Sequence, residues 1–179
     1  MRKKLSPALV VAILFAMTVA IFCLMFFTQS EMMKRVYGSE LRKDVFYIND
    51  LTERVLDQIA EDSPGGAELI YAAGELVRCD LGARIHEGYQ ALCGETASAL
   101  RNYGEALTEG TLSAEAEAKL ADAANTLTKR LRGATQYLMQ ELNNTDTDQM
   151  DDAYYDAMDV NASVYKRLSS YINQNAAAE

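Results

Sequence analysis

An almost unbroken apolar run lies near the N-terminus of the chain, from Ala8 to Phe27, and Thr18 is its one mild interruption. At about 1.5 Å of rise per helical residue the run spans roughly 30 Å, which matches the hydrocarbon thickness of a bilayer. The pattern therefore predicts a transmembrane anchor over residues 8–27. Representative anchor residues are Ala8, Leu14, Phe15, Ile21 and Phe27.

The charges on either side of this run predict its orientation. Arg2, Lys3 and Lys4 precede it, and basic residues stay on the cytoplasmic side of a membrane. Beyond it, Lys34 and Arg35 are balanced in part by Glu31. We therefore expect a cytoplasmic tail over residues 1–7, an anchor in the cell membrane, and an extracytoplasmic C-terminal part.

Cleavage of this segment is the main alternative to an anchor. A signal peptide has a shorter apolar region, of about 7–15 residues, and ends in a small-residue site. The best such site here, near Ala20, would leave the apolar stretch IFCLMFF on the mature protein. A lipoprotein would need a small residue before its cysteine, whereas Phe22 precedes Cys23. The sequence thus favours an uncleaved, single-pass anchor.

Beyond Ser30 the apolar positions recur at spacings of three and four, which is the period of amphipathic helices. Turn signals at residues 61–66, 108–113 and 143–147 divide this part into four helical stretches. Their expected ranges are about 30–60, 67–107, 113–142 and 146–172. Glycines in the second stretch predict a kink near Cys93–Gly94, and Ser113 is a candidate cap for the third.

Long amphipathic helices joined by short turns pack as antiparallel neighbours. The predicted fold class is therefore all-α, with the transmembrane helix followed by an antiparallel bundle of about four helices over residues 30–173. Residues 174–179 are expected to form a frayed tail. Asn161 falls on the apolar stripe of the last stretch, where a polar residue can fix the register of a bundle. The other interpretation is that Asn161 points aside and meets water.

Charge limits the partners of the part outside the membrane. The formal net charge is −9, all 26 acidic residues lie after the apolar run, and three of the 17 basic ones lie before it. An acidic surface repels both nucleic acid and anionic lipid headgroups. We expect no nucleic-acid partner, and the charge keeps an exposed helical domain soluble.

Candidate chemistry is sparse. His86 is the only histidine, and its charged neighbours Arg84 and Glu87 suggest a solvated helix face. The acidic run from Asp146 to Asp156 does not match the ligand spacing of an EF-hand loop. No catalytic, cofactor-binding or metal-binding constellation is evident, so the sequence predicts a protein that is not an enzyme and needs no cofactor.

Cys79 and Cys93 lie in the part expected outside the cytoplasm, where a disulfide is chemically permitted. If one straight helix carried both, their 14-residue separation would place them about 21 Å apart. A disulfide needs Cα atoms within about 7 Å of each other. We expect free thiols, and a redox pair remains the alternative.

One stretch carries a family resemblance, from Ala83 to Leu120. It contains Gly94-Glu95-Thr96-Ala97, followed after a short turn by Leu112-Ser113-Ala114-Glu115. This block resembles the membrane-anchored N-terminal helical region of YpeB-like spore-germination proteins, in which a Gly-Asp stands where this chain has Gly94 and Glu95. That family continues into C-terminal domains of PepSY type, whereas this chain ends at Glu179. The resemblance implies a bundle-only relative that places or protects a cell-wall lytic enzyme.

Two functional hypotheses follow. The first is a non-enzymatic, membrane-anchored interaction module that presents helix faces to a protein partner in the cell envelope, in support of an envelope or spore cell-wall lytic system. The alternative is a ligand-sensing helical bundle that signals through a membrane partner, because only about seven residues are expected inside the cell.

Overall fold

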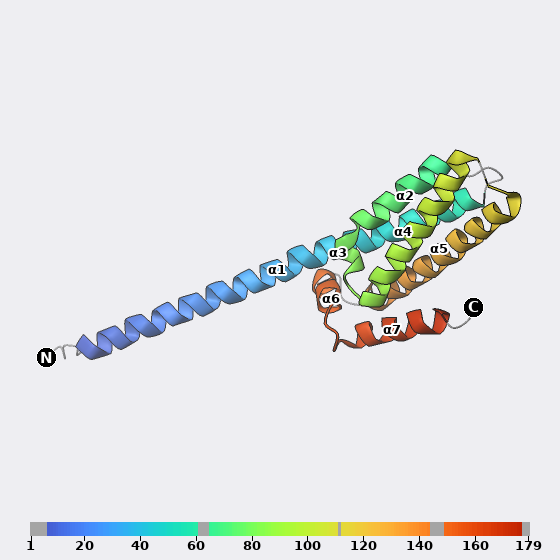
Figure 1. The fold of residues 1–179 in the computed structure, drawn as a ribbon. Helices are drawn as coiled ribbons and strands as arrows, with labels where there is room; N and C mark the ends of the chain where they lie inside the picture. The colour runs from blue at the N-terminus through green and yellow to red at the C-terminus, as the bar shows by residue number, and fades with distance from the viewer. Residues whose placement is uncertain (1–6, 61–64, 111, 144–148, 177–179) are drawn as a thin grey trace.

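The computed structural model describes residues 7–60, 65–110, 112–143 and 149–176, and every regular element of secondary structure among them is a helix (Figure 1). The helices are α1 (Pro7–Ile59), α2 (Gly66–Arg78), α3 (Asp80–Ala83), α4 (Glu87–Glu109), α5 (Ala114–Asn143), α6 (Met150–Asp156) and α7 (Ser163–Ala176). The predicted all-α class is confirmed.

Helix α1 has two halves with opposite surroundings. Its first half projects alone from the rest of the molecule, whereas its second half lies among the other helices (Figure 1). Phe15, Phe22 and Phe27 are about 70% exposed, at 73%, 71% and 69%. By length and composition, α1 is able to cross a membrane. Its lone, apolar first half contains the predicted anchor residues, of which Leu14 and Ile21 are also exposed and Ala8 lies in the first turns.

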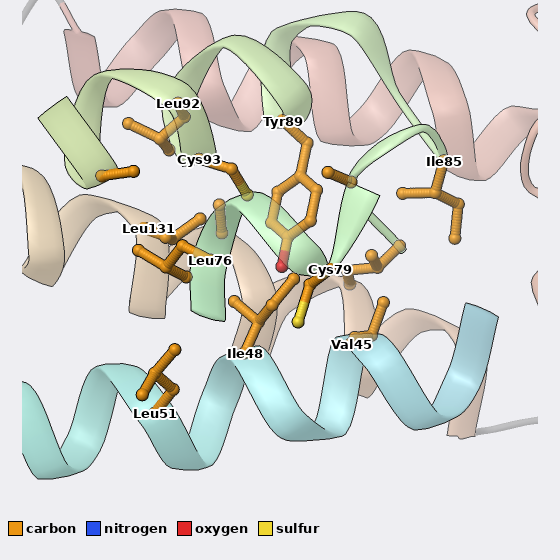
Figure 2. Packing of buried hydrophobic residues seen from close by; sticks show 14 of the residues in the cluster. Val45, Ile48, Leu51, Leu76, Cys79, Ile85, Tyr89, Leu92, Cys93 and Leu131 are labelled. Atoms are coloured by element: carbon orange, nitrogen blue, oxygen red, sulfur yellow. The ribbon is translucent and has the colours of Figure 1, made fainter. Parts of the chain in front are cut away.

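The core forms where the second half of α1 meets α2, α4 and α5 (Figure 2). The predicted stripe on α1 is largely confirmed, because Leu41, Val45 and Ile48 are fully buried. Tyr37 is the exception, at 42% exposed. Tyr89 of α4 is fully buried at the centre of this packing, close to residues of α1 and α2 (Figure 2).

The predicted second stretch is broken, but not where the glycines suggested. Helix α2 ends at Arg78, the short α3 follows, and α4 then runs without interruption through Cys93 and Gly94. The kink predicted at Cys93–Gly94 is therefore wrong. The interruptions lie instead on either side of α3, in which the backbone N–H of Gly82 donates to Asp44 Oδ2 of α1, at 2.9 Å. A Cβ on Gly82 would lie 2.4 Å from the Asp44 Cβ, so glycine permits this close approach.

The predicted fourth stretch is also broken, into α6 and α7. Asp159 Oδ1 accepts hydrogen bonds from the backbone N–H of Asn161, at 2.9 Å, and from its side-chain Nδ2, at 3.1 Å. Such local bonds give the backbone an alternative to the helix. Asn161 is exposed in this turn, so it does not lie on a buried seam. The interpretation that it meets water agrees with the structure.

The other predicted ends are close to the observed ones. Helix α4 ends at Glu109 and is capped by Gly110, whose φ of 62° is left-handed. Ser113 Oγ accepts from the backbone N–H of Ala116 at the start of α5. Most of two predicted turn signals, residues 61–64 of the first and 144–147 of the third, lies outside the described residues, as do Asp146 and Asp148 of the acidic run. Residues 174–176 of the expected frayed tail continue α7, and Asn175 Nδ2 donates to Tyr171 O at 2.8 Å.

Candidate interaction surface

A groove lies between the second half of α1 and helix α2. It has a volume of about 360 Å³, and its floor is apolar, because Leu51, Val55 and Ala72 are each 3% exposed or less. The rim is polar and aromatic, with Tyr71 63% exposed. The lining residues are Leu51, Arg54, Val55, Gln58, Ala67, Glu68, Tyr71 and Ala72.

The groove exists because α2 packs mainly against α4 and touches α1 only lightly. Helices α2 and α4 approach closely where Gly66 meets Gly104, and a Cβ on Gly104 would lie 2.6 Å from the Gly66 carbonyl oxygen. This tight contact holds α2 towards α4. Ala67 and Ala72 then face α1 with small side chains that leave the space between the two helices unfilled.

A polar network borders α1 and α2 in the same region. Tyr47 OH donates to Glu75 Oε2 at 2.8 Å, and Arg78 Nη1 donates to Glu75 Oε1 at 2.6 Å. The hydrogen bond from Tyr47 lowers the pKa of Glu75, while burial, followed by the neighbouring Glu75 carboxylate, raises the pKa of Tyr47. The Arg54 guanidinium lies 6.0 Å from the centre of the Tyr47 ring. These bonds fix side chains on both walls of the groove. None of them would activate one of these groups as a nucleophile.

Sequence reasoning did not find this network or the groove. The spacing of Glu75 and Arg78, three residues apart on one helix face, was a local signal for their ion pair. Nothing in the sequence indicated Tyr47 as the partner of Glu75, because the two residues lie 28 positions apart.

His86 is not on a solvated face, so the surface interpretation is wrong. It is 4% exposed, and its imidazole caps α4 by accepting from the backbone N–H groups of Gly88, at 3.0 Å, and Tyr89, at 3.3 Å. The ring packs against Tyr165 of α7, with 4.2 Å between centroids. Extended backbone angles at His86 place it at the cap position, where a polar acceptor satisfies amides that lack partners in the first turn.

We expect the free energy of unfolding to fall as the pH drops below about 6.5, the ordinary pKa of histidine. Burial lowers the pKa of His86, and Glu87 opposes this shift only in part. The unfolded chain therefore binds a proton at a higher pH than the folded chain, and acid favours unfolding. Protonation also removes the acceptor that caps α4.

The test compares urea unfolding of the detergent-solubilised full chain at about pH 7.5 and pH 5.5, on either side of the histidine pKa. His86→Asn retains a capping acceptor and should lose this part of the pH dependence. His86→Ala should cost about 0.5–2 kcal/mol at about pH 7.5 through loss of the cap. The cost should be smaller at about pH 5.5, where the wild type has already lost stability through His86. An equal pH dependence in the wild type and His86→Asn would contradict the assignment.

The two cysteines outside the apolar segment are free and buried. Free thiols are thus confirmed, although the premise of a single straight helix is wrong, because Cys79 follows α2 and Cys93 lies within α4. Burial raises the pKa of the Cys79 thiol to about 11 and that of the Cys93 thiol to about 12. Both thiols are therefore protonated and unreactive at neutral pH.

The residues that carry the family resemblance lie apart from the groove. Gly94 and Glu95 are on the exposed side of α4, Leu112 is 42% exposed, and Ser113 caps α5. Among the residues that the structure describes, none beyond the adjoining turns of α4 has an atom within 4 Å of a Cβ built on Gly94. In the described part of the chain, no group of three or more His, Cys, Asp or Glu side chains could hold a metal ion.

Comparisons with protein families, curated proteins and solved structures find no match to this chain.

Proposed function

We propose that the protein is a non-enzymatic, membrane-anchored interaction module. Residues 8–27 cross the cell membrane once, with the N-terminus in the cytoplasm, and the rest forms an extracytoplasmic antiparallel bundle whose principal helices are the second half of α1 with α2, α4 and α5. The observation that supports this most is the continuity of α1. One helix passes from an exposed apolar segment into a segment whose Leu41, Val45 and Ile48 are fully buried.

The partner we propose is an amphipathic helix of a protein in the cell envelope, docked in the groove between α1 and α2. An apolar strip of such a helix would cover Leu51 and Val55, and its flanking polar residues would meet Arg54 and Glu68. Helix-in-groove binding uses this combination of an apolar floor and a polar rim. Tyr71 is the exposed aromatic side chain best placed to anchor the contact.

The resemblance to YpeB-like proteins supports a more specific version of this role. A bundle fixed to the membrane would place or protect a wall-lytic enzyme of the envelope or spore. In this proposal the partner performs the lytic reaction, and the described residues of the bundle take no part in it.

The experiment is site-specific photocrosslinking in intact cells. A photoreactive residue at position 71 should capture the same envelope protein reproducibly, whereas one at Lys119, on the exposed surface of α5, should not. Tyr71→Glu with a photoreactive residue at Gln58 should lower the captured amount by about tenfold, the effect of removing an interface anchor. Equal capture from positions 71 and 119, or none from position 71, would contradict the proposal.

A sensing role is the second candidate, and the continuity of α1 favours it. The same helix forms one wall of the groove and continues without a break to the apolar segment. A ligand that separated α1 from α2 would therefore act directly on the helix that enters the membrane. Capture of a protein with a cytoplasmic output domain would favour sensing, and capture of a wall hydrolase would favour the first role.

A further inference from the structure

Helix α6 lies along α1 at the point where α1 leaves its lone, apolar half (Figure 1). Near the start of α6, Asp151 pairs with Arg42 of α1 at 3.0 Å. At its end, Asp156 lies 3.8 Å from Lys34. The partners on α1 thus step from residue 42 to residue 34, so α6 descends towards the apolar segment.

Backbone packing fixes this position. A Cβ on Gly38 would lie 1.8 Å from the carbonyl oxygen of Asp151, so the backbones of α1 and α6 touch where glycine removes the side chain. The neighbouring Tyr154 is fully buried and ties α6 to the core. The next residue, Tyr155, is consequently held on the side of α6 that faces the apolar segment, rather than on a loose arm.

A shallow depression of about 350 Å³ separates Tyr155 from α1. Its other walls are Phe26, Gln29, Ser30 and Met33 of α1. Phe26 and Met33 are apolar and exposed, at 67% and 49%, and the depression therefore continues without a break into the exposed apolar surface of the anchor.

The level of this depression matches the edge of a bilayer. If the hydrocarbon layer ends near Phe27, Met33 lies six residues, or about 9 Å, beyond it. The headgroup layer is about 5–8 Å thick on each side of the hydrocarbon. Phe26 then borders the acyl chains, and Tyr155 lies at headgroup level, where tyrosine is enriched in membrane proteins.

We propose that this depression is a binding site for a phospholipid of the outer leaflet. The first carbons of an acyl chain lie against Phe26, at the edge of the hydrocarbon layer. The glycerol and headgroup region meets Gln29, Ser30 and the Tyr155 ring, and Met33 lies at its outer edge. The occupant is a lipid because the depression opens onto the surface that the bilayer itself covers. This inference rests on the proposed anchor, and the lipid joins α6 to the membrane surface.

The test uses tryptophan as a unique reporter, because the chain contains none. The full-length variants Tyr155→Trp, Phe22→Trp and Tyr71→Trp are placed in phosphatidylcholine vesicles with or without brominated acyl chains, which quench nearby tryptophan. Phe22→Trp reports on the anchor. Tyr71→Trp reports on the groove between α1 and α2, which the proposed topology places far from the membrane. Met33→Trp, on the opposite wall, replaces Tyr155→Trp if that variant does not fold.

We expect bromines near the carboxyl end of the chain to quench Tyr155→Trp by about half or more, and Tyr71→Trp hardly at all. Bromines deeper in the chain should quench Phe22→Trp more strongly than Tyr155→Trp. If Phe22→Trp is quenched while Tyr155→Trp and Met33→Trp resemble Tyr71→Trp, the lipid site is wrong and the anchor stands. If Phe22→Trp is not quenched, the anchor is wrong and the lipid site falls with it.

Discussion

Replacing Tyr89 with alanine should destabilise the folded domain by about 3–5 kcal/mol, the range for removing a large aromatic side chain from a packed core. Tyr89 is fully buried and lies in the core with Ile48, Cys79 and Leu131 (Figure 2). The truncation would leave a cavity bordered by more than one helix, and close packing elsewhere would limit its collapse. Urea unfolding of the full chain in detergent, followed by helical circular dichroism, measures the loss.

Tyr71→Ala is the matched control, because it makes the same substitution on α2 at a side chain that is 63% exposed. Its free energy of unfolding should change by no more than about 0.5 kcal/mol, as at ordinary surface positions. If the two alanine variants unfolded at the same urea concentration with equal slopes, Tyr89 would not be the centre of the core.

Tyr89→Phe separates the hydroxyl group from the ring. Thr135 Oγ1 donates its hydrogen to Leu131 O at 2.7 Å, so Tyr89 OH is the donor in its own 2.7 Å contact with Thr135. Phenylalanine removes that donor and leaves the bond from Thr135 to Leu131 in place. The expected cost is about 0.5–1.5 kcal/mol, the net value of one hydrogen bond.

Periodicity alone was sufficient to predict much of the helical core. The stripes on α1 and α5 were correct at Leu41, Val45, Leu131 and Leu138, all of which are 1% exposed or less. These helices are long, so their apolar period repeats over many turns and shows which face is buried. The all-α class and the apolar N-terminal helix depend on the same strong signal.

The breaks around α3 and α7 could not be read from that period. The stripe through Met150, Tyr154 and Ala157 continues in sequence across Asn161, yet α6 ends at Asp156 and the side chain of Asp159 binds the backbone of Asn161 in the turn before α7. At the other break, His86 caps α4 with a ring nitrogen, a role that its charged sequence neighbours concealed. In both places a local polar contact overrides a continuing apolar pattern.

The groove was beyond sequence reasoning for a different reason. It results from the close contact of Gly66 and Gly104, which draws α2 towards α4 and away from α1. The glycines of the predicted second stretch instead suggested a kink near Cys93–Gly94. Whether a glycine breaks a helix or admits a neighbouring backbone depends on tertiary packing, which one sequence does not contain.

Labelling intact cells with a membrane-impermeant maleimide should modify a cysteine introduced at Lys119, an exposed position on α5. The maleimide should label the native thiols very little, because Cys79 and Cys93 are buried and Cys23 lies within the proposed span. The wild-type chain is therefore the negative control, and opened cells supply the total that can be labelled. Lys34→Cys and Lys166→Cys serve as additional reporters on α1 and α7.

The outcome decides whether one apolar helix holds an extracytoplasmic domain. We expect Lys119→Cys to be labelled in unbroken cells to nearly the same extent as in opened ones, while the wild type stays unlabelled. Labelling of Lys119→Cys only after the cells are opened would place the domain in the cytoplasm, and the proposed topology would be wrong.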